Sequence, residues 1–200
     1  MSGAWPTSPG WKAQTLASFA PTLVSKSING YRHSRQVAGQ VWRLTAAYPP
    51  MFRAQFAPVT AFAAAQRGQF ETFTVVPPEI SVPQGNIVGS TPLVNGASQT
   101  GRLLITDGWA NDTLVMKAGD LFKVATNDKV YMVTADGTSD GSGNLTLAIE
   151  PALVASPGNN DALTVTAVPF TMSMLSDIQE FRHSAGGFFT FEVDFEEVLS

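Results

Sequence analysis

The stretch Phe189-Thr190-Phe191-Glu192-Val193-Asp194-Phe195-Glu196 decides the fold. Large apolar residues hold every second position in it, and polar residues, mostly acids, hold the others. Because successive side chains of a β-strand point to opposite faces, this alternation predicts a strand with one buried face and one acidic face. Such a strand needs neighbours to pair with, so we expect a chain built mainly from β-sheet.

Charge is distributed unevenly along the 200 residues. Residues 1–80 hold seven cations and two acids, a net charge of +5, and residues 81–170 hold four cations and eight acids, a net charge of −4. Residues 171–200 hold one cation and six acids, a net charge of −5. Opposite charge at the two ends is expected where the termini meet in one domain, or where the basic face of one subunit docks on the acidic face of the next.

The first segment predicts the order strand, helix, strand. A mixed apolar pattern over residues 36–48 and a β-branched and aromatic run over residues 70–76 predict the two strands. Between them, apolar residues at 52, 56, 59 and 63 have helical spacing and predict a helix near residues 50–67, with Gly68 suited to a left-handed cap. Pro58 predicts a kink or a fresh helix start within it.

A middle segment is bounded by the proline-rich linker 76–85 and the turn cluster 155–160. Within it, short apolar runs alternate with glycine and aspartate turns, and no helical stretch intervenes. The pattern predicts a small antiparallel barrel or sandwich. The expected strands are residues 102–106, 121–125, 129–134, 145–149 and 163–167.

The residue inventory does not favour an enzyme. The chain has no cysteine, which excludes thiol catalysis and cysteine-ligated metal, and it has only two histidines, His33 and His183. Each histidine is followed by a serine, but a catalytic triad is defined by geometry rather than by adjacency. The loop 136–144 lacks the ligand spacing of an EF-hand and suits a hairpin turn, and no glycine-rich phosphate loop occurs. We therefore expect no catalytic, metal or cofactor-binding residues.

Nucleic-acid binding and membrane insertion are both disfavoured by the composition of the chain. The net charge of −4 argues against specific nucleic-acid binding, which needs a basic excess, and no apolar run is long enough to insert into a membrane. The start of the sequence lacks a signal-peptide pattern, so we expect synthesis and folding in a cytoplasm.

Trp109 lies in a predicted turn and is the best candidate for an exposed aromatic residue that contacts a ligand such as a sugar.

Six short motifs fall in two regions, residues 39–73 and 117–151, which make up about a third of the chain. They are GQVWRL (39–44), YPPM (48–51), FAAAQRGQFETF (62–73), KAGDLF (117–122), VYMVTAD (130–136) and DGSGNLTLAIEP (140–151). These motifs resemble those of tailed-phage distal tail and minor tail proteins. None of these motifs is a catalytic signature.

The resemblance implies a specific architecture. A tail-tube-like β-sandwich with a helix would form a ring domain from residues 1–80 and 170–200, and residues 83–168 would be inserted as an OB-like β-barrel. Distal tail proteins assemble as a hexameric ring around the DNA channel and link the tail tube to the tail-tip hub and other baseplate proteins. The expected location is the tail tip of the virion, assembled in the host cytoplasm.

Within this family, six residues are candidates for a subunit interface or for the channel. They are Arg32, Arg35, Arg43, Glu192, Asp194 and Glu196. A basic edge that meets an acidic edge would set the register of a ring, and an acidic lumen would repel DNA. The alternatives are a carbohydrate- or receptor-binding module, in which Trp109 would contact the ligand, and a tail-tube or connector subunit. Residues 1–30 are expected to form an arm that packs on a neighbour.

Overall fold

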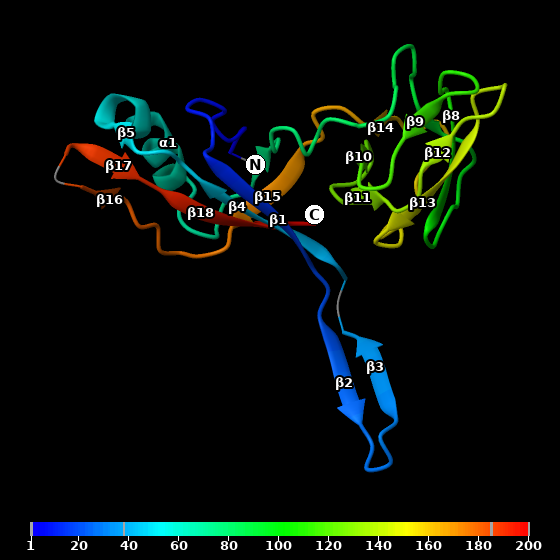
Figure 1. The fold of residues 1–200 in the computed structure, drawn as a ribbon, viewed down its shortest axis with the longest axis horizontal. Coiled ribbons are helices and arrows are strands. Elements are labelled where there is room, and N and C mark those ends of the chain that lie inside the picture. The colour runs from blue at the N-terminus through cyan, green and yellow to red at the C-terminus, as the bar shows by residue number, and fades with distance from the viewer. Residues whose placement is uncertain (1, 38, 185, 200) are drawn as a thin grey trace.

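The computed structural model describes residues 2–37, 39–184 and 186–199. This part of the chain is mainly β-structure with a single helix, in agreement with the sequence-based prediction. Figure 1 shows a sheet that carries the helix at one end of the molecule and a barrel-like sheet at the other end. A long hairpin projects away from both sheets.

The first sheet joins strands from both ends of the chain. Its order is β1-β4-β18-β15-β6, and each neighbouring pair is antiparallel. The strands are β1 (Ala13–Phe19), β4 (Val41–Ala47), β18 (Glu192–Glu197), β15 (Phe170–Met174) and β6 (Phe73–Val75). The C-terminal strand therefore lies at the centre of this sheet, between strands from the first and last parts of the sequence.

Alternation along the strands gives this sheet one buried face. On β4, Trp42, Leu44 and Ala46 are buried while their sequence neighbours remain partly exposed. Phe195 of β18 lies directly opposite Leu44 on the same buried face. Burying such side chains stabilises a fold by about 1.5–3 kcal/mol each.

The helix α1 (Arg53–Ala65) packs on that buried face. It buries Phe56, Val59 and Ala63, the spacing that the sequence predicted, and it runs through Pro58 as one element. The expectation that Phe52 would share this face is wrong, because Phe52 lies in β5 (Met51–Phe52) before the helix and is 60% exposed. Gly68 follows the helix with φ +67°, as a left-handed position requires.

Two predicted strands are each divided in the structure. The run 189–196 breaks at Phe191, because β17 (Phe188–Thr190) leaves β18 to pair with β5 and with β16 (Arg182–His183). The run 36–48 contains only the last residue of β3 (Arg32–Gln36) before β4 begins at Val41. The apolar alternation alone could not reveal that these runs change partners.

The second sheet is six-stranded and nearly closed. Its order is β14-β10-β11-β13-β8-β7, and a bridge between Leu93 and Ala162 links its two ends. The strands are β14 (Leu163–Thr164), β10 (Leu121–Val124), β11 (Val130–Val133), β13 (Leu145–Glu150), β8 (Leu103–Asp107) and β7 (Leu93–Val94). A small ribbon of β9 (Leu114–Met116) and β12 (Gly137–Thr138) joins them. All five strands predicted in the middle segment overlap strands of this sheet.

The N-terminal arm divides into two parts with different surroundings. Trp5 is buried in the core beneath α1, and Ala4 forms a bridge with Thr74 of β6, so this part packs on its own chain rather than on a neighbour. The part from Thr22 onward forms β2 (Thr22–Lys26), which pairs only with β3 in a two-stranded hairpin. Among the described residues, no helix is long and apolar enough to span a membrane.

Candidate assembly surfaces

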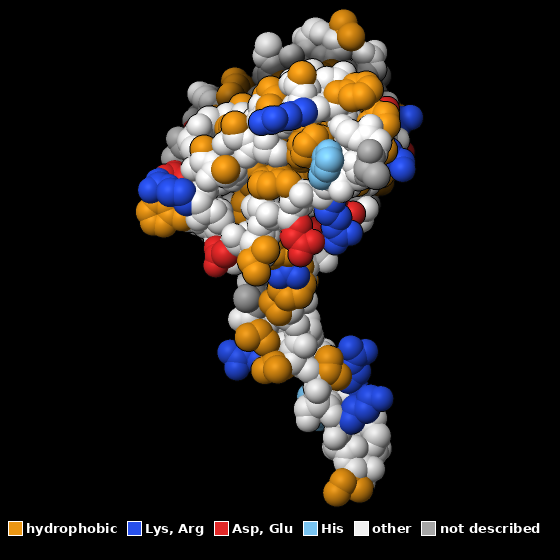
Figure 2. Space-filling view, turned by 90° about the vertical axis from the view of Figure 1, so that its left-hand side faces the viewer, with side chains coloured by type: hydrophobic (Ala, Val, Ile, Leu, Met, Phe, Trp, Pro, Cys, Tyr) orange, Lys and Arg blue, Asp and Glu red, His pale blue; other side chains and the backbone are white. Residues whose placement is uncertain are grey.

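The β2–β3 hairpin exposes both of its faces. Lys26 lies opposite Arg32 on one face, and Leu23 lies opposite Arg35 on the other. Every residue of the two strands is exposed. The first acidic residue of the chain is Glu71, so no acid accompanies these cations on the hairpin. The structure thus places the predicted interface residues Arg32 and Arg35 on a projecting basic arm, visible at the bottom of Figure 2.

The hairpin also exposes apolar side chains near its tip. Ile28 is fully exposed and Tyr31 is 71% exposed, and both belong to the turn that joins β2 to β3. A two-stranded hairpin alone in water is only marginally stable. The arm therefore combines exposed cations with an exposed apolar tip.

The other four predicted interface residues lie together on the exposed face of the five-stranded sheet. Arg43 Nε donates to Glu196 Oε2 at 2.6 Å, and Thr45 Oγ1 donates to Asp194 Oδ1 at 2.5 Å. Glu192 lies on the same face opposite Ala47, and no residue that the structure describes forms an ion pair with it. Arg43 thus pairs with an acid of its own chain, and it is separate from the cations of the hairpin.

Besides the acids, this exposed face carries mostly small and polar side chains. β1 contributes Ala13, Thr15 and Ala17, which lie opposite Ala47, Thr45 and Arg43 of β4. At the hairpin end of the same face, Phe19 lies opposite Val41, and the guanidinium of Arg43 lies 4.0 Å from the centre of the Phe19 ring. The face therefore contrasts with the opposite one, where Trp42, Leu44 and Phe195 pack beneath α1.

A groove of about 700 Å³ opens at one end of this face. Its walls are the end of the β1–β4 ladder, the start of β18 and the segment 176–182 that follows β15. Three carboxylates line it, Glu180, Glu192 and Asp194, together with the cations Lys12 and Arg182 and the exposed Ile178. Glu180 accepts a hydrogen bond from Arg182 at 3.1 Å.

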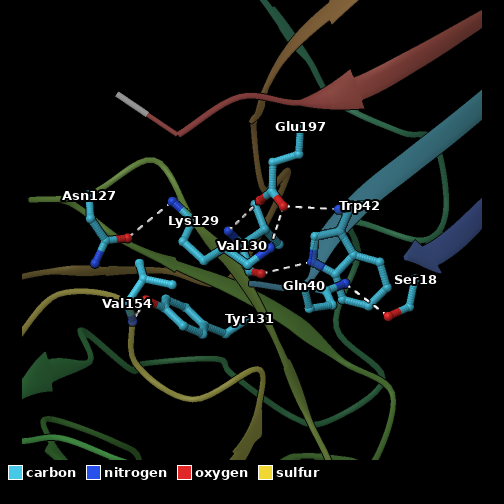
Figure 3. A network of polar contacts seen from close by, with 9 residues as sticks. All are labelled: Ser18, Gln40, Trp42, Asn127, Lys129, Val130, Tyr131, Val154 and Glu197. Carbon is cyan, nitrogen blue, oxygen red and sulfur yellow. Dashed lines mark hydrogen bonds and ion pairs between the residues drawn. The ribbon is translucent and has the colours of Figure 1, made fainter. Parts of the chain in front are cut away.

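A buried polar junction connects the two sheets, and sequence reasoning missed it (Figure 3). Glu197, at the end of β18, forms an ion pair with Lys129, and both side chains are fully buried. The Glu197 carboxylate also accepts hydrogen bonds from the backbone N–H groups of Trp42 at 3.0 Å and Val130 at 2.9 Å. Trp42 Nε1 in turn donates to the Val130 carbonyl at 2.8 Å. The sequence held a signal for this site, because Glu197 has the same parity as the buried residues Phe191, Val193 and Phe195.

Burial lowers the proton affinity of Lys129 in this junction. Loss of hydration lowers the pKa of Lys129, and the negative charge and hydrogen bond of Glu197 oppose that shift. Contact with Glu197 therefore offsets part of the cost that burial imposes on the charged form of Lys129.

Comparison with known proteins finds one family model and one relative similar to this chain. Residues 81–168 match the family model of the distal tail protein pb9, B domain. Over 139 residues, which make up 69% of this chain and 67% of the relative, the sequence is 26% identical to distal tail protein pb9 of Escherichia phage T5. Both matches are to distal tail proteins, and together they support a phage distal tail protein. The motif resemblance found in the sequence is confirmed, and the similarity supports a structural role in a phage tail.

One predicted ligand contact of this distal tail protein is wrong. Trp109 is only 4% exposed and lies in the core of the six-stranded sheet, where its Nε1 donates to Thr106 Oγ1 at 2.8 Å. The turn position of Trp109 suggested exposure, but the chain folds the indole inward. An aromatic platform for sugar stacking is therefore not formed by this residue.

The remaining polar motifs have local structural partners. Asp140 accepts the backbone N–H groups of Ser142 and Asn144, both at 2.8 Å, and these bonds lower its pKa. His33 lies on the hairpin, and the ring of His183 is 4.7 Å from that of Phe189. Among the described residues, no group of three or more acidic or histidine side chains could hold a metal ion.

Proposed function

We propose that this distal tail protein forms a closed ring at the tail tip, hexameric as in the family, around the channel through which DNA passes. In this proposal, residues 1–80 and 170–200 are the ring domain, and residues 83–168 are an inserted OB-like domain. The five-stranded sheet supports this division because it combines strands from both ends of the chain. The family match over residues 81–168 also supports it, because the matched range covers the proposed inserted domain.

The observation that carries the proposal is the exposed face of β1, β4 and β18. Most of its side chains are small, hydroxylated or acidic, with Arg43 and Phe19 toward the hairpin end, and Glu192, Asp194 and Glu196 lie in a row on one strand. Directed toward a bore, these carboxylates would repel the phosphates of DNA and prevent it from adhering to the wall. The opposite face is occupied by α1, so only this face is free to line a channel.

Contacts between subunits would be heterologous, which is the type that closes into rings. The basic hairpin with Arg32 and Arg35 supplies one side of such a contact, and the acidic surfaces of the neighbouring subunit supply the other. Further partners in the proposal are the tail tube protein on one side and the tail-tip hub and other baseplate proteins on the other. The role requires no catalytic group, cofactor, sequence-specific nucleic-acid contact or membrane insertion, and assembly would take place in the host cytoplasm.

The mass and symmetry of the purified protein test this proposal. Light scattering and negative-stain class averages are expected to show a single closed ring with a central opening. Long stacked tubes would favour a tail-tube subunit instead, and a monomer at high concentration in the presence of its tail components would contradict the ring.

A further inference from the structure

The five-stranded and six-stranded sheets meet over a narrow contact. Two chain segments connect them, residues 76–92 and 165–169. Among the described strand residues of the six-stranded sheet, Leu121 and Val130 are buried in the core of the five-stranded sheet, and Met132 is partly buried against it. All three lie on the neighbouring strands β10 and β11. Domains that touch over a small surface are free to move relative to one another unless specific contacts hold them.

The polar contacts between the sheets converge on three consecutive residues at the start of β11. The carboxylate of Glu197 forms an ion pair with Lys129 and accepts the Val130 backbone N–H at 2.9 Å. Thr171 Oγ1 of β15 donates to Asp128 Oδ1 at 2.9 Å. Removing one partner of a buried ion pair leaves the other charge uncompensated. Glu197 is therefore the side chain on which the docking of the six-stranded sheet depends most.

A crevice of about 360 Å³ opens between the two parts of the chain beside this junction. One wall includes Val37 and Gln40, which precede β4, and the other includes Arg102 and Val154 of the six-stranded domain. Gln40 is only 3% exposed, and its Nε2 donates to Ser18 Oγ at 3.0 Å. Its Oε1 is buried without a hydrogen-bond partner among the described residues, which costs free energy that contact with water would remove.

Docking thus carries costs that release would remove. Burial lowers the pKa of Lys129, because the ammonium loses its hydration, and Glu197 offsets only part of that loss. Release returns the ammonium and the Gln40 oxygen to water. It also exposes the apolar side chains of Leu121 and Val130, which opposes release. Because these effects act in opposite directions, the charge of Glu197 decides which position is favoured.

We propose that the Glu197–Lys129 pair is a latch, and that breaking it lets the six-stranded sheet swing away from the five-stranded sheet as a rigid body. The segments 76–92 and 165–169 are the hinges of this movement, and the crevice between Val37 and Val154 widens. Each sheet has a hydrophobic core of its own, so both stay folded after release. The movement takes place within one copy and does not depend on the proposed ring.

A distance measurement across the crevice tests the latch. The native sequence has no cysteine, so Val37→Cys and Val154→Cys, both at exposed positions, take one nitroxide label each. The labelled full chain is diluted into excess unlabelled protein, and double electron–electron resonance then reports distances within one copy. We expect one short, narrow distance distribution. Adding Glu197→Gln is expected to shift and broaden it toward longer distances, whereas the matched control Glu196→Gln on the exposed face is expected to leave it unchanged.

A second label pair separates release from unfolding. Ile105→Cys and Val154→Cys both lie in the six-stranded domain, and their distance is expected to stay the same with Glu197→Gln. Combining Lys129→Met with Glu197→Gln removes the uncompensated charge and is expected to restore part of the short crevice distance.

Four results would overturn the latch. They are a broad crevice distance in the parent protein, an unchanged crevice distance with Glu197→Gln, broadening of the label pair within the six-stranded domain, and no recovery in the double variant. None of these results bears on whether the protein forms a ring.

Discussion

At the scale of single residues, Tyr48 shows how the N-terminal arm is held on the sheet. Its hydroxyl accepts Nε1–H from Trp5 at 2.8 Å and from Trp11 at 2.9 Å, and both Tyr48 and Trp5 are buried. One oxygen therefore accepts hydrogen bonds from the buried indole of Trp5 and from the partly buried indole of Trp11.

Tyr48→Phe is expected to lower the free energy of unfolding by about 1–3 kcal/mol, because it leaves a buried indole N–H unpaired. Urea denaturation followed by tryptophan fluorescence measures the change. The matched control is Tyr31→Phe on the exposed hairpin, which is expected to change stability by less than about 0.5 kcal/mol. Equal effects of the two substitutions would contradict the role of Tyr48.

Tyr48 also makes stability depend on pH. Burial raises its pKa, and the hydrogen bonds from Trp5 and Trp11 reduce that shift. The folded state holds the phenol proton more tightly than the unfolded state, so this contribution is complete below the unfolded pKa of about 10 and is lost as pH rises through the folded pKa.

The stability difference between the parent protein and Tyr48→Phe is therefore expected to shrink as pH rises above about 10. Lys129 and Tyr131 titrate in both proteins, so their contributions cancel in the difference. Urea titrations at a series of pH values provide the measurement. A difference that stays constant, or grows, in alkaline solution would refute this assignment.

The Lys129–Glu197 pair is expected to be strongly coupled, because both groups are buried. Glu197→Gln leaves the Lys129 ammonium without its partner and should lower the free energy of unfolding by about 3–5 kcal/mol. The double variant with Lys129→Met should lose less stability than the sum of the losses in the two single variants. A double-mutant cycle measures the coupling. The matched cycle on the half-exposed pair Arg43 and Glu196 is expected to give only about 0–1 kcal/mol, and similar coupling in both cycles would count against the role of burial.

At the scale of elements, strong apolar alternation predicted the buried faces correctly, whereas the shortest strands could not be predicted from sequence. The apolar faces of β4 and α1, and the acidic face of β18, follow from sequence periodicity. The two-residue strands β7 and β12 carry too few positions to show any period. The Lys129–Glu197 junction joins residues 68 positions apart, so only the parity of Glu197 indicated it.

The hairpin is expected to serve assembly rather than the stability of the subunit. Its ends are adjacent, because Val37 N–H donates to the Pro21 carbonyl at 3.0 Å, so Thr22–Gln36 can be replaced by the two-residue turn Asn-Gly. Since no side chain of these strands is buried, the free energy of unfolding should change by less than about 0.5 kcal/mol.

The shortened protein should nevertheless fail to form the higher-mass particle. Thermal unfolding and light scattering on the same sample separate the two effects. A ring that persists without the hairpin, or a subunit that no longer folds, would contradict the assembly role.

At the scale of the whole molecule, β-class could be predicted from alternation. The resemblance to distal tail proteins implied that both ends of the chain share one domain, which charge alone left open. The sequence could not give the projection of the hairpin or the inward rotation of Trp109, because both depend on packing between segments far apart in the chain. The two hydrophobic cores lie side by side, with the Glu197 junction between them. The position of the second sheet beside the first is therefore fixed by specific polar contacts as well as by chain connectivity.

We propose that the β1–β4–β18 face of the protein surrounds a channel. A cryo-electron microscopy reconstruction of the assembled particle, with the subunit fitted into density, measures this directly. We expect Glu192, Asp194 and Glu196 to line the bore, with α1 on the outside. A bore lined by α1 or by the six-stranded sheet would contradict it.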